Sequence, residues 1–114
     1  MPKTSDFLEN VLKLLAPLGD VRPKSMFGGF GIFLDDSMFA LITKNDELFL
    51  KADALNQPSF EEIGLKPYGR MPYYAAPVDS LKDWTEIKHW AEGAVEASSR
   101  AKASRAGAKR TSGS

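Results

Sequence analysis

The stretch KSMFGGFGIFLDDSMFALITKNDELFLK, residues 24–51, decides the fold of this chain. Apolar runs of strand length alternate in it with short groups of turn residues, such as Asp35-Asp36-Ser37 and Asn45-Asp46. Strands joined by such short connections are antiparallel, because a parallel pair needs a crossover of a dozen or more residues. The pattern therefore predicts a meander of four strands at about 24–28, 30–34, 38–43 and 47–51.

Side chains within each strand are expected to alternate between the two faces of the sheet. The groups predicted to share a face are Phe30, Ile32 and Leu34 against Phe33, then Met38, Ala40 and Ile42 against Phe39 and Leu41, then Leu48 and Leu50 against Phe49. Both faces therefore carry large apolar groups, whereas a sheet with one face in water shows polar residues there. Two explanations remain open, namely a local helix or flap over the second face, and a partner subunit in a homodimer.

Helical patterns flank the sheet. Before it, apolar residues recur at helical spacing, and the predicted helix ends near Leu15 or Ala16 because Pro17 disfavours a further turn. After it, a long helix is predicted to begin at Asp83 and to fray near Ser104. Its apolar stripe consists of Trp84, Ile87, Ala91, Ala94 and Val95.

The segment between the meander and the last helix is predicted to hold a short helix and two short strands. The helix is expected to turn Phe60 and Ile63 inward and to end at Gly64. The strands are expected at 65–68 and 71–75, in edge or irregular positions because prolines interrupt them. The predicted fold class is therefore α+β in two layers, with an antiparallel sheet of four meander strands plus two short strands, an N-terminal helix, a short middle helix and a long C-terminal helix.

The length and composition of the sequence limit the classes of protein to which it can belong. A chain of 114 residues suits one domain with a single core. The absence of cysteine excludes disulfides and thiolate chemistry. No apolar run approaches about 20 residues, the length of a membrane-spanning helix, and the N-terminus lacks the pattern of a signal peptide. We therefore expect a cytoplasmic protein with no membrane contact.

The net charge of zero hides a separation of charge along the chain. Every acidic residue lies at or before Glu96, and the basic residues that follow are Arg100, Lys102, Arg105, Lys109 and Arg110. We expect a folded domain over residues 1–98 and a basic tail over residues 99–114 that is partly helical and then disordered. The tail is a candidate nucleic-acid contact through phosphate neutralisation, and the alternative is a solubilising end.

Few residues offer catalytic or cofactor-binding chemistry. The chain has one histidine, His89, so neither a serine-hydrolase triad nor a zinc site is expected. The run Gly28-Gly29-Phe30-Gly31 leads into a strand rather than a helix, which favours a turn or bulge over a phosphate-binding loop. The sequence predicts no catalytic residues, no metal and no cofactor. A small ligand pocket is a further alternative, near Arg22, Lys24, Arg70, Tyr73 and Tyr74.

The glycine run and its surroundings resemble a known family. Met26-Phe27-Gly28-Gly29-Phe30-Gly31, followed by Met38-Phe39-Ala40-Leu41 and Leu48-Phe49-Leu50-Lys51, is similar to the N-terminal domain of the TfoX/Sxy family. Met71-Pro72-Tyr73-Tyr74 and Pro77 resemble the second motif of that domain, and the resemblance covers roughly residues 7–98. It marks as structural motif residues Met26, Phe27, Gly28, Gly29, Gly31, Tyr73, Tyr74 and Pro77.

This resemblance implies a function that the residues alone do not. The family is typified by regulators of natural competence, which act on transcription of DNA-uptake genes in concert with another regulator. It implies a two-layer α+β fold without catalytic residues or a cofactor. Two features differ from the competence regulators: they carry a second, helical domain where this sequence has its basic tail, and the loop between Tyr68 and Met71 is short.

We therefore expect a non-enzymatic regulatory module that works through a protein partner, a transcription regulator. Candidates for the partner or ligand surface are Arg22, Lys24 and Arg70. Direct nucleic-acid binding through the tail, and binding of a small ligand, remain as alternatives.

Overall fold

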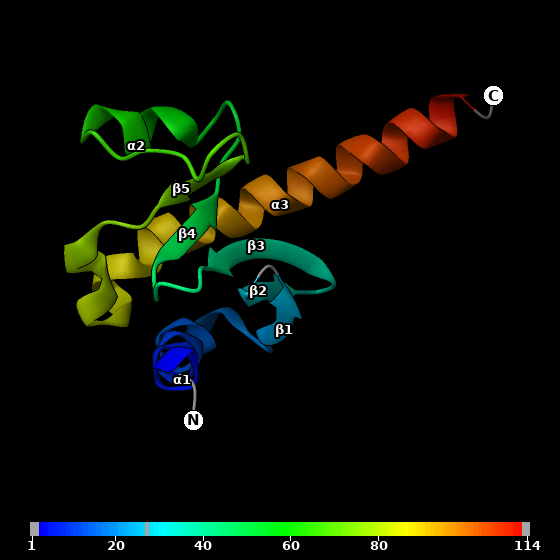
Figure 1. The fold of residues 1–114 in the computed structure, drawn as a ribbon. Helices are drawn as coiled ribbons and strands as arrows, with labels where there is room; N and C mark the ends of the chain where they lie inside the picture. The colour runs from blue at the N-terminus through cyan, green and yellow to red at the C-terminus, as the bar shows by residue number, and fades with distance from the viewer. Residues whose placement is uncertain (1–2, 27, 113–114) are drawn as a thin grey trace.

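The computed structural model describes residues 3–26 and 28–112, with side chains for residues 6–26 and 28–103, so the motif residue Phe27 lies outside the description. Its elements, with η for a 3-10 helix, are α1 (Lys3–Leu15), η1 (Ala16–Leu18), β1 (Arg22–Met26), β2 (Gly29–Leu34), β3 (Ser37–Ile42), β4 (Leu48–Lys51), α2 (Gln57–Glu62), β5 (Tyr73–Ala75), η2 (Val78–Lys82) and α3 (Trp84–Ser112). Figure 1 shows α3 running along the sheet and projecting beyond it.

The sheet is the meander that the sequence predicts. Within the described residues it has five strands in the order β1-β2-β3-β4-β5, and every neighbouring pair is antiparallel. The β2–β3 connection is tight because Asp35 and Asp36 adopt positive φ angles of 52° and 65°, as a two-residue hairpin turn requires. The strand predicted at 65–68 is reduced to a bridge between Pro67 and Tyr74, because proline offers no N–H to a longer ladder.

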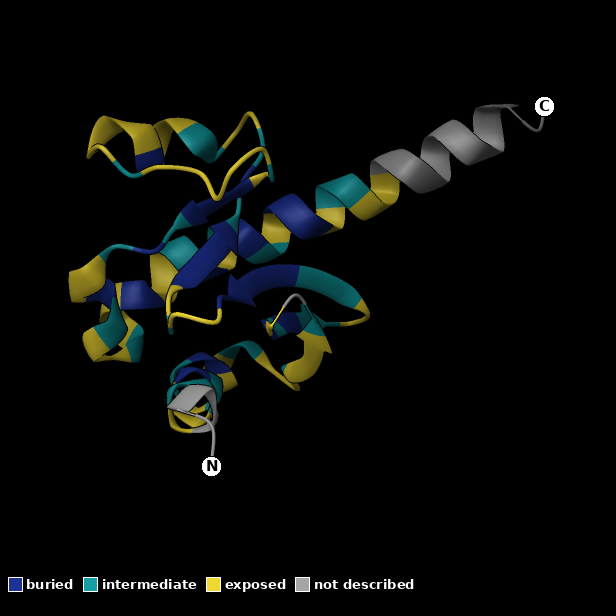
Figure 2. Ribbon diagram, in the orientation of Figure 1, coloured by how far each residue is buried: buried dark blue, intermediate teal, exposed yellow. Residues whose placement is uncertain are grey.

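Helices α1 and α3 cover one face of the sheet, and the main core lies between these two layers. Its buried members include Val11, Leu15, Ile32, Ala40, Ile42, Leu50, Ile87, Ala91 and Ala94. The apolar stripe predicted for α3 is confirmed, and its alanines let the helix approach the strands closely. Figure 2 shows the buried residues concentrated on β3, β4 and the middle of α3, whereas most of α2 is exposed.

A β-bulge in β3 changes which side chains reach this core. Ile32 pairs with Ala40, but the next residue, Phe33, pairs with Met38, so Phe39 is the extra residue of the bulge. Phe39 and Ala40 both belong to the helix-covered core, and Met38 packs on the opposite face. The predicted alternation is therefore wrong at Met38 and Phe39, because one extra residue reverses the facing of the residues beyond it.

The face opposite to the helices, called the open face below, has a smaller cluster of buried residues: Leu41, Phe49 and Tyr73. The 64–72 loop covers part of it, since the ring of Tyr68 lies 4.9 Å from that of Phe49 and Met71 packs on the same cluster. The prediction of large apolar groups on both faces is confirmed. In the part of the chain that the structure describes, a loop provides part of the cover.

Two helical predictions differ from the structure. Phe60 is buried as predicted, but Ile63 is 57% exposed, because α2 ends one residue before it and no longer holds it on the inner stripe. Helix α3 continues past Ser104 to Ser112, since the alanine, lysine and arginine residues there are strong helix formers. Its predicted start is confirmed, because Asp83 caps the helix by accepting the backbone N–H of Glu86 at 3.0 Å.

Candidate functional site

Arg100, the first of the predicted nucleic-acid residues, is held in an ion pair within the protein. Its Nε donates to Oδ2 of Asp53 at 2.6 Å and its Nη2 donates to Oδ1 at 2.9 Å. This hydrogen bonding is the largest cause that lowers the pKa of Asp53. A carboxylate oxygen of Glu96 lies 3.9 Å from the same guanidinium. Arg100 is therefore less available to a phosphate than its place in the sequence suggests.

The remaining basic residues of the tail lie further along α3. Nζ of Lys102 donates to the backbone oxygen of Asp35 at 3.3 Å, at the β2–β3 turn, and its side chain is exposed. The side chains of Arg105, Lys109 and Arg110 lie outside the described residues, although their backbone forms part of α3. Nucleic-acid contact by these residues stays a prediction.

The motif glycines allow a positive φ angle at one position and close packing within the sheet at two others. Gly28 has a φ angle of 77°, which glycine adopts without strain. A Cβ on Gly29 would lie 1.9 Å from the carbonyl oxygen of Ile42, so a larger residue does not fit there. A Cβ on Gly31 would meet the thioether ends of two methionines, at 2.7 Å and 2.9 Å. Pro77 stands at the start of η2. The three glycines thus meet requirements of backbone conformation and packing.

Tyr73 and Tyr74 are adjacent but point to opposite faces of the sheet. Tyr74 packs in the helix-covered core, where its ring lies 5.3 Å from that of Phe60 and its hydroxyl donates to Glu61 at 2.9 Å. Burial, and then the hydrogen bond to Glu61, raise the pKa of Tyr74. Tyr73 belongs to the open-face cluster, and its hydroxyl donates to the backbone oxygen of Met38 at 3.3 Å.

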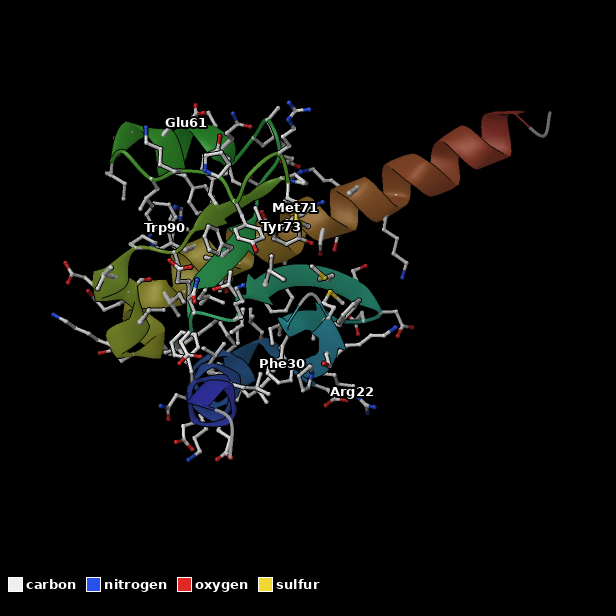
Figure 3. The ribbon with its side chains drawn as sticks, in the orientation of Figure 1. Arg22, Phe30, Glu61, Met71, Tyr73 and Trp90 are labelled. Carbon is white, nitrogen blue, oxygen red and sulfur yellow. The ribbon has the colours of Figure 1, made fainter. Side chains whose placement is uncertain are left out.

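The basic residues predicted as a partner or ligand surface do not form one patch. Arg22 and Lys24 lie on β1 and line a shallow hollow of about 330 Å³. Arg70 is exposed and directly precedes Met71 in the chain. Figure 3 shows Arg22 at the β1 end of the molecule, well separated from Met71 and Tyr73. The structure thus brings Arg22 and Lys24 together, with Arg70 elsewhere.

A cleft between α2 and α3 is the feature that the sequence reasoning missed. It has a volume of about 260 Å³, and its lining residues include Phe60 and Trp90, whose rings lie 5.0 Å apart. Figure 3 shows Trp90 between the two helices. The walls include Leu55 and Asn56 before and at the start of α2, and His89, Gly93, Glu96 and Arg100 on α3. The α3 residues of the lining recur every three or four positions, so they share one helix face, and one of them is a glycine. This spacing was visible in the sequence and could have indicated the cleft.

These features coincide with a known domain. The sequence model of the TfoX N-terminal domain matches residues 13–98, which include the sheet, α2 and the part of α3 that packs on the sheet. The chain belongs to the TfoX N-terminal domain family. This match confirms the resemblance carried by the glycine and tyrosine motifs.

A relative of this TfoX N-terminal domain is the "DNA transformation protein TfoX1" of Aliivibrio fischeri (strain ATCC 700601 / ES114). The two sequences are 29% identical over 79 residues, which is 69% of this chain. The match spans 37% of the length of the relative. The shared part is therefore this domain and not the whole relative.

Two further observations concern side chains and helices of this TfoX N-terminal domain. Within the described residues, no group of three or more His, Cys, Asp or Glu side chains lies close enough together to hold a metal ion. His89 is exposed on α3, with its ring 5.8 Å from that of Trp90 in an edge contact. Among the helices of residues 3–26 and 28–112, none is both long and apolar enough to cross a membrane.

Proposed function

We propose that this TfoX N-terminal domain is a non-enzymatic regulatory module in bacterial DNA uptake, and that it acts by binding a regulator of transcription. The observation that carries the proposal is the family match over residues 13–98, together with a relative whose name describes a DNA transformation protein. The proposed role is exercised in the cytoplasm, where transcription takes place.

Exposed apolar side chains around α2 support contact with another protein. Leu55, just before α2, is 72% exposed, and Ile63, just after it, is also largely exposed. Such side chains contribute little to the stability of the monomer, and together with the adjoining cleft they provide an apolar surface for a partner.

The proposal is tested by deleting the gene in the source strain. Transcripts of DNA-uptake genes and the frequency of transformation by added DNA should both fall several-fold, and the intact gene supplied in trans should restore both. Transcripts that do not change after deletion would contradict the regulatory role. A fall in transformation without a fall in transcripts would place the protein at a later step.

Direct nucleic-acid binding is the second candidate, because the basic residues after position 98 belong to α3, which continues as one helix to Ser112. The test is fluorescence anisotropy with labelled duplex DNA across a salt series. The full-length variant Arg105→Gln/Lys109→Gln/Arg110→Gln is compared with Lys13→Gln/Lys82→Gln/Lys88→Gln, which removes the same number of positive charges from residues 1–98. If the tail binds phosphates, the first variant alone reduces the slope of log K against log salt, by about 3 if all three residues contact phosphates. Equal binding by both variants would remove the tail from consideration.

A homodimer through the open face is a further prediction. The buried cluster on that face limits the apolar area that remains for a second subunit, since its members are already covered within one chain. Sedimentation velocity over a range of concentrations measures self-association, and a single monomeric species at high concentration would contradict the homodimer.

A further inference from the structure

The α2–α3 cleft has the shape and chemistry of a receptor for one large side chain. Its volume of about 260 Å³ is on the scale of a single large side chain, and its lining includes the aromatic residues Phe60 and Trp90. Phe60 is fully buried beneath the cleft, whereas Trp90 is only half-buried and lines it. Tryptophan is enriched among the residues that contribute most of the binding energy in protein interfaces.

Gly93 keeps the cleft open, although packing does not require a glycine there. It lies within α3, where glycine is a poor helix former compared with alanine. A Cβ at this position would lie 3.7 Å from Nδ2 of Asn56 and 3.8 Å from its Cβ, which are ordinary contact distances. An alanine would therefore fit and would strengthen the helix. The glycine therefore leaves the cleft wider and the helix less stable than an alanine would.

The surroundings of the cleft are acidic. The charge of Arg100 is balanced by its two hydrogen bonds to Asp53, so Glu96 beside it contributes an unbalanced negative charge at the rim. On α3, residues 88–100 contain Glu92 and Glu96 against Lys88 and the paired Arg100, and α2 contains Glu61 and Glu62 without a basic residue. A ligand that enters the cleft is thus favoured if it carries positive charge.

We propose that this cleft binds a segment of a partner protein in which one large apolar side chain is flanked by lysine or arginine. The apolar side chain enters between Leu55 and Trp90, and a flanking cation meets Glu96 in the cleft lining. This inference rests on the proposed function, because it names the surface through which the module contacts its partner. The basic tail of a second copy fits less well, since its apolar residues are alanines, too small to fill the cleft.

The test uses the full-length ¹⁵N-labelled protein and three synthetic peptides, observed by NMR. The probe is acetyl-Lys-Lys-Phe-Lys-Lys-amide, and the controls replace its phenylalanine by alanine or its lysines by glutamate. The chain has two tryptophans, so the indole N–H of Trp90 reports on the cleft and that of Trp84 is the internal reference. The probe should shift the Trp90 and Gly93 signals saturably, at least about tenfold more tightly than either control, with Trp84 unmoved. Equal responses to the three peptides overturn the proposal.

Two substitutions of Gly93 test the same site from the protein side. Gly93→Leu fills the cleft and should abolish the Trp90 shift, and Gly93→Ala narrows it and should weaken binding about fivefold or more while raising the melting temperature. Because Gly93→Ala strengthens the helix, its loss of binding does not result from unfolding. Unchanged binding by Gly93→Ala and by a folded Gly93→Leu overturns the proposal.

A matched pair of charge variants separates rim contact from general electrostatics. Glu96→Gln should weaken binding of the cationic probe and reduce its salt dependence, whereas Glu86→Gln, the same change on α3 outside the cleft lining, should not. Equal effects of the two variants contradict a specific rim contact.

Failure of the inference and failure of the proposed function give different results. If the gene deletion lowers uptake transcripts but Gly93→Leu restores them fully, the regulatory function stands and the cleft is not its contact site. If the peptide binds as expected but deletion changes no transcript, the cleft is a receptor and the proposed function is wrong. Self-association that Gly93→Leu abolishes would identify a second copy as the occupant and overturn the proposed partner.

Discussion

The two faces of the sheet are stabilised in different ways. The helix-covered face packs fully buried side chains against α1 and α3, including Ile32, Phe39, Ala40, Ile42 and Leu50. The open face has a cluster of three buried hydrophobic residues within the described chain, partly covered by the 64–72 loop, and the flexible ends of Met26 and Met38 lie on the same face. Closely packed helices cannot readily close a space that a substitution leaves beneath them, whereas flexible methionine side chains and a loop can shift to fill it. We therefore expect the helix-covered face to dominate stability.

The largest contrast is expected between two phenylalanines, one on each face. Phe39→Ala should lower the free energy of unfolding by about 3–5 kcal/mol, because it removes a fully buried ring and leaves a cavity under the helices. Phe49→Ala should lower it by roughly 2–3 kcal/mol, since the loop and methionines can close over the space. Urea unfolding of both variants measures the difference. Equal losses would mean that the two faces are equally rigid.

Enlarging a small residue on each face tests the same contrast in the other direction. Ala40→Leu should cost about 1–3 kcal/mol or more, because Ala40 is fully buried beneath the helices. Gly31→Ala should cost under about 1 kcal/mol, since its new Cβ would meet the movable ends of Met26 and Met38. Urea midpoints provide the measurement. A larger loss for Gly31→Ala would show that the methionines are fixed in place.

The adjacent tyrosines give a smaller effect that depends on pH. Tyr74→Phe should lower the melting temperature more than Tyr73→Phe, because Tyr74 hydrogen-bonds a carboxylate at 2.9 Å and Tyr73 a carbonyl at 3.3 Å. The raised pKa of Tyr74 means that its contribution is complete below the usual tyrosine value of 10.0 and is lost as the pH rises through the higher folded value. Thermal melts between pH 8 and pH 12 should therefore converge for wild type and Tyr74→Phe at alkaline pH. Curves that stay parallel would rule out this linkage.

The smallest effect concerns the ion pair that joins α3 to the segment after β4. Asp53→Asn should lower the free energy of unfolding by under about 1 kcal/mol at pH 7, because the side chains of Arg100 and Asp53 are 38% and 29% exposed. The pKa of Asp53 is lowered, so this stability is present above the usual value of 3.8 and is lost as the pH falls through the folded value. Melts from pH 7 to pH 2 check this. A loss comparable to that of Phe39→Ala would mean that the ion pair, rather than the core, holds α3 in place.

Most of the architecture could be predicted from local patterns. The meander follows from short apolar runs and turn residues, and Asp83 as the cap of α3 follows from its side chain. The motif glycines were predicted as structural, and the packing of Gly29 against β3 gives the reason. The facing of Phe39 could not be predicted, because a bulge is set by the pairing of two strands and leaves no mark in the alternation of one.

The candidate site was less predictable than the fold. Trp90 and Gly93 were visible in the sequence as members of a helix, but their relation to Leu55 depends on how α2 packs against α3. Arg100 likewise appeared as one of several basic residues, and its ion pair with Asp53 joins residues far apart in the chain. Neither relation has a signature in local spacing.

The sequence by itself determined the antiparallel meander, the helix-covered layers and membership of the TfoX N-terminal domain family, because periodicity, turn chemistry and the glycine motif are local properties. The tertiary structure alone decided which face Phe39 occupies, which cations are already paired, and that α2 and α3 leave a cleft between them. These depend on strand register and on the packing of distant segments, where a single extra residue or a missing Cβ changes which side chains meet.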